Sequence, residues 1–363
     1  MKSRNLNLDA LRGLAILLVL GRHLDFFPLW SKIGWAGVDL FFVLSGFLIS
    51  GLLFREWQLT GAIDLRRFYV RRGFKIYPAF YVLLAISAMV SLAAPGITTH
   101  PISWRAMLAE GLFMQNYFPG IWAQTWSLAV EEHFYIALPI VLWFLYRGRG
   151  AQPNPFRSLP VIFMAVSTIA IFLRIATSWQ ITTAADERFY LCPTHLRIDG
   201  LLFGVLLSYY RYFEPDKFRQ LAAGRGSATV IVVALFLLLA VPLNNPIMHT
   251  VGFTLVFFGF GFLLARVIDS NPHRYLSAVA VAPLATIGYY SYSIYLWHGW
   301  VCRLLPHSTL PGFLGCLAAA IFLGIAMAKL VEYPMLALRD RFFPSSEGIA
   351  VFSRPDARPQ FVA

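Results

Sequence analysis

The stretch LDALRGLAILLVLGRH, residues 8–23, decides the fold class. It is apolar enough for a membrane helix, yet it contains Arg12 and His23. An ionisable side chain inside a helix bundle costs at least about 2.5 to 3.5 kcal/mol on insertion scales. The two residues are separated by about three helical turns, so they lie on one face at opposite depths. Such a pattern indicates a buried site or a pathway.

The composition of the rest of the chain is that of a membrane protein. The chain has 363 residues, 58% of them hydrophobic and 13% charged, whereas a soluble domain has roughly 25% charged residues. Ten apolar runs can each cross a membrane core: residues 8–27, 35–54, 74–94, 127–146, 159–178, 196–212, 228–243, 247–268, 284–304 and 311–332. The sequence therefore predicts an all-α, polytopic membrane bundle of about ten transmembrane helices.

Basic residues predict the orientation, because short cytoplasmic loops carry excess Lys and Arg. With the N-terminus inside, the outer loops hold only Lys32, Arg105 and Arg188 of the 30 Lys and Arg residues. Both termini are thus expected in the cytoplasm, and the net charge of +12 needs no nucleic-acid partner. No cleavage site follows the first apolar run, so we expect it to be retained. Residues 1–343 should form one membrane domain, and residues 344–363 a flexible cytoplasmic tail.

Arg12 and His23 suit a carrier with a charged head and a long thin arm, such as coenzyme A. The guanidinium could hold phosphate while the imidazole reaches the reactive end. The alternative is that Arg12 pairs with Asp9 or reaches the cytosol, and that His23 has no chemical role. The three cysteines, Cys192, Cys302 and Cys316, are too few and too scattered for a thiolate metal site, and no metal is expected.

A second basic cluster lies in RRFYVRRGFKIYP, residues 66–78. It contains Arg71, Arg72 and Lys75, at the point where the third predicted helix leaves the cytoplasm. Arg72 and Lys75 share a helix face and could hold one pyrophosphate. Alternatively, the cluster is a membrane anchor that contacts anionic lipid.

Carboxylates occur in WSLAVEEHFY, residues 126–135, on the predicted outer side. Glu131 and Glu132 point about 100° apart, so at most one of them faces a given cavity. That carboxylate could orient an imidazole or accept hydrogen bonds from sugar hydroxyls, or both could belong to a solvated helix start.

Further polar groups lie inside apolar runs: Asp39, Arg197, Asp199 and His298. Arg197 and Asp199 could neutralise each other. For Ser45 and Gly46 the sequence favours close helix packing over nucleophilic catalysis, because no base is placed beside the serine.

Taken together, these stretches resemble the acyltransferase-3 family of membrane O-acyltransferases. The resemblance runs through LDALRGLAILLVLGRH, GVDLFFVLSGFLIS, the basic run ending in IYP, WSLAVEEHFY, RIDGLLFG, SYSIYLWH and VEYP, and covers nearly the whole chain. In one place it departs from the family pattern, which has a second arginine where this chain has Lys75. A lysine cannot bind phosphate with a planar, two-pronged group.

The resemblance implies an acetyl-CoA-dependent O-acyltransferase, with acyl-CoA as co-substrate and no permanently bound cofactor. The acceptor would be a hydroxyl of a carbohydrate such as a surface polysaccharide or lipid-linked sugar, and the enzyme would be a multi-pass protein of a bacterial-type plasma membrane. Arg12, Arg71, Arg72 and Lys75 are expected on the donor side, and His23, Glu131 and Glu132 toward the acceptor.

We hypothesise that His23 takes the proton of the acceptor hydroxyl, while Glu131, Glu132 or Asp39 fixes its orientation. Direct transfer is preferred over an acyl-enzyme. Arg197, Asp199 and His298 are expected to bind substrate or to support the site. One rival interpretation is a transporter or exporter of an anionic or glycan substrate, which buried charges could also serve. Another is a membrane sensor or scaffold without turnover.

Overall fold

The computed structural model describes residues 5–93, 96–148, 152–178, 191–269 and 278–344. Over these ranges the chain is helical and contains no strand. Its elements are α1 (Leu6–Leu24), α2 (Pro28–Ile33), α3 (Ala36–Thr60), α4 (Leu65–Ala93), α5 (Trp104–Gly111), η1 (Ala123–Thr125), α6 (Trp126–Arg147), α7 (Leu159–Ser178), α9 (Thr194–Phe213), α10 (Pro215–Ala223), α11 (Arg225–Ala240), η3 (Met248–Gly252), α12 (Phe253–Asp269), α13 (Ala278–Tyr289), α14 (Ser291–Leu304), α15 (Leu310–Met327), η5 (Ala328–Glu332) and α16 (Tyr333–Phe342).

The helical class is as predicted, and described helices overlap all ten predicted ranges. Among the described residues, however, six spans are long and apolar enough to cross a membrane, or seven if α10 and α11, bent by 53°, count as one. The others fail for visible reasons. Helices α1 and α9 each carry three charged residues, and α13 and α14 are short and separated at Tyr290. The count of ten is thus not confirmed. The predicted tail, apart from Pro344, lies outside the described residues.

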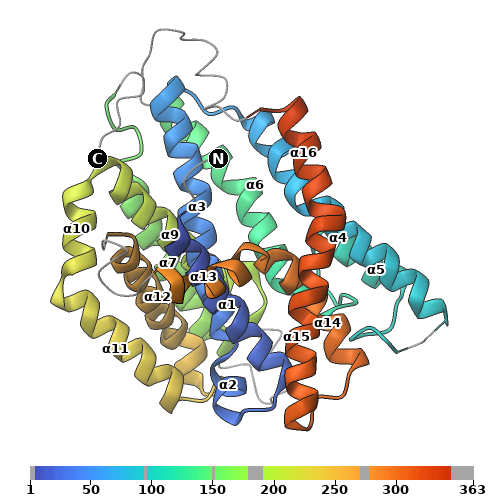
Figure 1. The fold of residues 1–363 in the computed structure, drawn as a ribbon. Coiled ribbons are helices and arrows are strands. Elements are labelled where there is room, and N and C mark those ends of the chain that lie inside the picture. Colours follow the sequence, from blue (N-terminus) through green and yellow to red (C-terminus); the bar gives the residue numbers. More distant parts are fainter. Residues whose placement is uncertain (1–4, 94–95, 149–151, 179–190, 270–277, 345–363) are drawn as a thin grey trace.

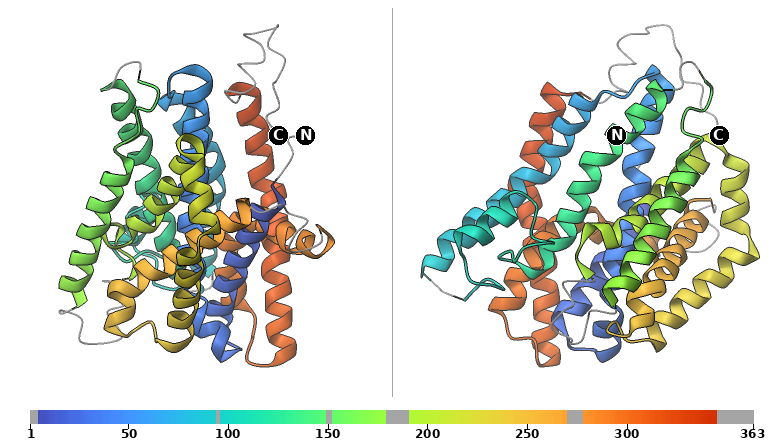
Figure 2. Two further views of the ribbon diagram at one scale, coloured as in Figure 1. Left: turned by 90° about the vertical axis from the view of Figure 1, so that its left-hand side faces the viewer. Right: turned by 180° about the vertical axis from the view of Figure 1, so that it is seen from behind.

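Helix α3 lies at the centre of the bundle and is buried along most of its length. Helices α10, α11 and α12 lie on one flank of it, and α4, α15 and α16 on the other (Figure 1). Short α13 runs across the direction of α15 at mid-height (Figure 2). The outer helices expose many large apolar side chains, such as Phe172, Phe236 and Phe322, as expected of a surface that faces lipid.

Glycines allow the central helices to approach closely. A Cβ at Gly46 of α3 would lie 1.9 Å from the carbonyl oxygen of Leu201 in α9, and one at Gly204 would lie 2.2 Å from that of Val43. The packing role predicted for Gly46 is therefore what the structure shows. In the same way, a Cβ at Gly288 of α13 would lie 1.7 Å from the carbonyl oxygen of Asp9 in α1.

The variant Gly46→Ala should destabilise the protein by about 1 to 3 kcal/mol, because its methyl group would push α3 away from α9. Thermal unfolding of the detergent-purified chain would measure the change. The matched control is Gly315→Ala on α15, where the added methyl group meets nothing within 4 Å. Equal melting temperatures for the two variants would contradict the packing argument.

Candidate functional site

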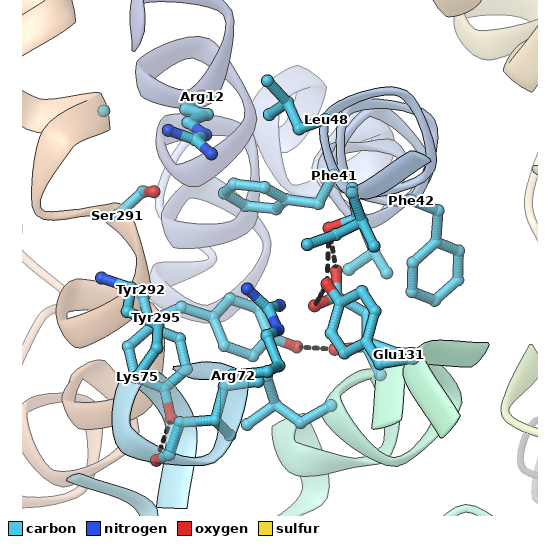
Figure 3. Close-up of a pocket in the computed structure, with 18 of the residues that line it drawn as sticks. Arg12, Phe41, Phe42, Leu48, Arg72, Lys75, Glu131, Ser291, Tyr292 and Tyr295 are labelled. Atoms are coloured by element: carbon cyan, nitrogen blue, oxygen red, sulfur yellow. Dashed lines mark hydrogen bonds between the residues drawn. The ribbon is translucent and has the colours of Figure 1, made fainter. Parts of the chain in front are cut away.

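A cavity of about 150 Å³ lies between α1, α3, α4, α6 and the junction of α13 with α14. Its polar lining includes Arg12, Ser45, Arg72, Lys75, Glu131 and Tyr135. Figure 3 shows the two guanidinium groups entering from different helices, with Glu131 on the side opposite to Arg12. We call this space the basic cavity.

The cations of the basic cavity differ in how far they are already neutralised. Arg12 lies 3.3 Å from Asp9, as in the alternative weighed above, but still lines the cavity. Lys75 forms a close ion pair with Glu332. Arg72 has no carboxylate within ion-pairing distance in the described part of the chain, and its guanidinium lies 3.9 Å from the centre of the Tyr135 ring. Arg72 is therefore the cation most available to an anionic ligand.

Arg71 lies elsewhere, contrary to the expectation that it joins Arg72 at the donor. It lies 3.2 Å from Asp340 of α16, donates to the carbonyl oxygen of Phe343, and does not line the cavity. The reason is geometric, because consecutive residues of a helix point about 100° apart.

Glu131 closes a hydrogen-bonded triangle between α3 and α6. Its Oε1 accepts a hydrogen bond from Ser45 Oγ at 2.8 Å. Its Oε2 lies 2.7 Å from the hydroxyl oxygen of Tyr135. That hydroxyl oxygen lies 2.9 Å from Ser45 Oγ, which completes the triangle. The predicted place beside His23 is thus wrong, because α6 begins inside the bundle at Trp126 and carries Glu131 into the basic cavity. The sequence favours packing over catalysis for Ser45, and it does not single out Tyr135; the structure shows both in contact with Glu131.

Glu132 points away from Glu131, as the 100° separation predicts. It is buried, accepts a hydrogen bond from the hydroxyl of Tyr77 at 3.2 Å, and is absent from the lining of the basic cavity.

A second cavity of about 220 Å³ contains His23. Its lining also includes Arg22, Trp35, Gln124, Trp126 and Cys192, and we call it the histidine cavity. Val38 and Tyr295 line both cavities, so the two spaces adjoin. Arg12 and His23 thus line two different, neighbouring cavities rather than one continuous cavity among those described.

Tyr295 stands between the chambers. Its hydroxyl lies 2.6 Å from Ser127 Oγ and donates to the backbone oxygen of Gln124 at 2.6 Å. Its own backbone oxygen lies 2.6 Å from Nδ1 of His298, whose ring centre is 4.8 Å from that of His23. The structure thus brings His298 next to His23, which sequence spacing could not show.

The remaining predicted charges form two buried ion pairs. Arg197 binds Asp39 at 2.7 Å, and Asp199 binds Arg174 at 2.6 Å. The expectation that Arg197 and Asp199 neutralise each other is wrong, since residues two apart on a helix point about 200° apart. Asp39 lines neither cavity and is engaged with Arg197 rather than with His23. Arg174 was missed, although a lone arginine in an apolar run is a visible signal.

The loop that leads into α6 is held by Glu110 of α5. Its Oε1 accepts from the backbone nitrogens of Ile121 and Trp122 at 2.9 and 3.0 Å, and from Thr125 Oγ1 at 2.9 Å. Burial raises the pKa of Glu110 to about 7, against the opposing effect of these hydrogen bonds. The same loop supplies Gln124 to the histidine cavity.

Because its pKa is raised on folding, Glu110 should stabilise the fold most below about pH 4.5, and this contribution should be lost as pH rises through about 7. Glu110→Gln stays neutral and keeps an oxygen for the three donors. Its melting temperature relative to the native chain should therefore increase between pH 5 and pH 8. A difference that does not change with pH would contradict this account.

Comparison with known proteins identifies the family of the chain. Residues 5–329 match the family model described as an acyltransferase domain, acyltransferase-3. The chain is 28% identical over 316 residues to the peptidoglycan O-acetyltransferase OatA of Listeria monocytogenes, covering 80% of this chain and 48% of that protein. It is 30% identical over 310 residues to the putative O-acetyltransferase SAR0937 of Staphylococcus aureus, covering 80% of this chain and 49% of that protein.

The chain thus spans about half the length of these relatives. No solved structure matches it. The family match covers most of the chain and includes both cavities. The chain belongs to the acyltransferase-3 family.

Proposed function

We propose that this chain is a membrane O-acetyltransferase that moves an acetyl group from cytosolic acetyl-CoA to a hydroxyl of a carbohydrate. The observation that carries the proposal is the pair of adjoining cavities, one basic and one containing an accessible histidine, with Tyr295 between them. Relatives named as O-acetyltransferases support the reaction class, and one is named for peptidoglycan.

The basic cavity suits the donor. Arg72 offers a guanidinium without a carboxylate partner in the described chain, and Arg12 is 39% exposed despite its contact with Asp9. Phosphate is the anion that such groups bind best. A cavity of about 150 Å³ is too small for the whole carrier, so we place the thioester arm inside and the nucleotide toward the cytosol.

The histidine cavity suits a sugar. Trp35 and Trp126 supply aromatic surface, and Gln124 supplies a polar side chain next to His23. Few polar groups on an apolar lining are typical of small-molecule sites. An acceptor held here would have its hydroxyl near the imidazole, whose neutral form can accept a proton.

In the proposed reaction, His23 removes the proton of the acceptor hydroxyl while the oxygen attacks the thioester carbonyl. The carbon–sulfur bond breaks, and the leaving thiolate takes the proton from the imidazolium, which yields the ester and free coenzyme A. The acyl carbon must pass Tyr295, so this side chain has to rotate during the cycle.

We further propose that the chain crosses a bacterial inner membrane ten times and that both termini lie on its cytoplasmic side.

Changing His23 to Ala should lower kcat about 10² to 10⁴-fold, because the base is lost. The full chain in proteoliposomes would be given acetyl-CoA and a soluble muropeptide, and thiol release and ester formation would be measured. His249→Ala, which removes a buried histidine outside both cavities, is the control. Wild-type activity in the His23 variant would refute the assigned role. A chain that releases no thiol with any sugar would favour a transporter.

The neighbouring arginines allow a matched test of donor binding. Arg72→Lys should raise KM for acetyl-CoA about 10-fold, because the planar group stacked on Tyr135 is lost. Arg71→Lys should leave KM unchanged, because Arg71 binds Asp340 outside the cavity. Equal effects of the two variants would mean that a general positive potential, rather than the lining of this cavity, binds the donor.

A further inference from the structure

His298 is a buried histidine with a hydrogen-bond partner for only one of its two ring nitrogens. It lies on α14 with 0% of its surface exposed. Its Nδ1 lies 2.6 Å from the backbone oxygen of Tyr295, one turn earlier. A carbonyl oxygen only accepts hydrogen bonds, so Nδ1 must carry the proton.

The other ring nitrogen, Nε2, then presents a lone pair. An imidazolium at this depth would carry a large desolvation cost, so we take the ring as neutral. Nε2 is buried and has no hydrogen-bond partner within the residues that the structure describes. A buried acceptor without a hydrogen bond is unfavourable, and a nearby donor would relieve this.

His23 is the ring next to it. The two ring centres are 4.8 Å apart and the rings are inclined by 58°. The two rings do not form a hydrogen bond in the structure, but their centres are close enough that a rotation of the His23 side chain can bring one of its nitrogens to Nε2 of His298. His23 also lines the histidine cavity, whereas His298 lines neither cavity. One ring can therefore reach a ligand, and the buried ring can act only through the first.

We propose that His298 is the positioning residue of His23: its Nε2 accepts the N–H of His23 and so leaves the other His23 nitrogen with a lone pair toward the acceptor hydroxyl. This inference rests on the proposed function. During transfer, His23 gains the hydroxyl proton, keeps its N–H bonded to His298, and returns the gained proton to the leaving thiolate. No further reagent is needed, and His298 does not change its protonation.

The arrangement also links the base to the partition between the cavities. The backbone of Tyr295 fixes the tautomer of His298, and the ring of Tyr295 lines both chambers. A single turn of α14 thus holds the divider and, through His298, the base. Hydrogen bonds from a partner of this kind fix the tautomer and the orientation of a functional histidine.

The kinetic test compares two substitutions of the same residue. His298→Leu should lower kcat about 100-fold and leave KM for acetyl-CoA unchanged. His298→Gln should recover about 10-fold of that loss, because its side-chain oxygen can accept the N–H of His23. The control is His249→Leu, which removes a histidine that is 2% exposed and should leave kcat unchanged. The inference is overturned if folded Leu and Gln variants are equally active.

A second measurement does not depend on turnover. Solid-state NMR of the full chain, labelled with ¹⁵N in histidine only and reconstituted in lipid, should show a nitrogen–nitrogen correlation across the His23 to His298 hydrogen bond. It should also show one His23 tautomer in the wild type and a mixture in His298→Leu. A wild-type spectrum without the correlation and with mixed tautomers would overturn the inference. An inactive wild type with the correlation would overturn only the proposed function.

Discussion

The two buried ion pairs of α9 constrain the rest of the bundle. Arg197 reaches Asp39 on α3, and Asp199 reaches Arg174 on α7, with all four side chains almost fully buried. Leaving one of these charges without its partner would cost about 3 to 5 kcal/mol. The pairs therefore fix α9 between two neighbours and hold it at the close glycine contact with α3. Because α3 carries lining residues of both cavities, the position of the site follows from this charge pairing.

The candidate site residues were easier to predict than their partners. Apolar patterning gave the helical class, and charges inside apolar runs marked most of the side chains that are buried together. Pairing was not predictable, because Arg197 and Asp39 are 158 positions apart and meet only through the packing of α3 on α9. Glu131 was misplaced for a similar reason, since a sequence pattern does not show how deep in the bundle a helix begins.

The number of spans is not confirmed, because two of the predicted helices carry several charged residues. Helices α1 and α9 hold the charges that build or brace the site, and those charges make both helices too polar for a simple test of membrane crossing. Lys75, the one departure from the family pattern, pairs with Glu332. A lysine with its own carboxylate has less charge to offer a phosphate, so Arg72 carries more of that role in the proposed donor site.

Glu332 owes its position to a π-helical turn, Ala328–Glu332, inside the long span Leu310–Phe342. A π-turn closes its hydrogen bonds one residue later than an α-turn. Everything after it is therefore out of phase with the start of the span by about one residue, or about 100°. Deleting a single residue of this turn would convert it to regular α-helix and leave the hydrophobicity of the span almost unchanged. It would nevertheless rotate α16 away from α4 and separate Arg71 from Asp340, so the spacing of this segment is constrained even where its side chains are interchangeable.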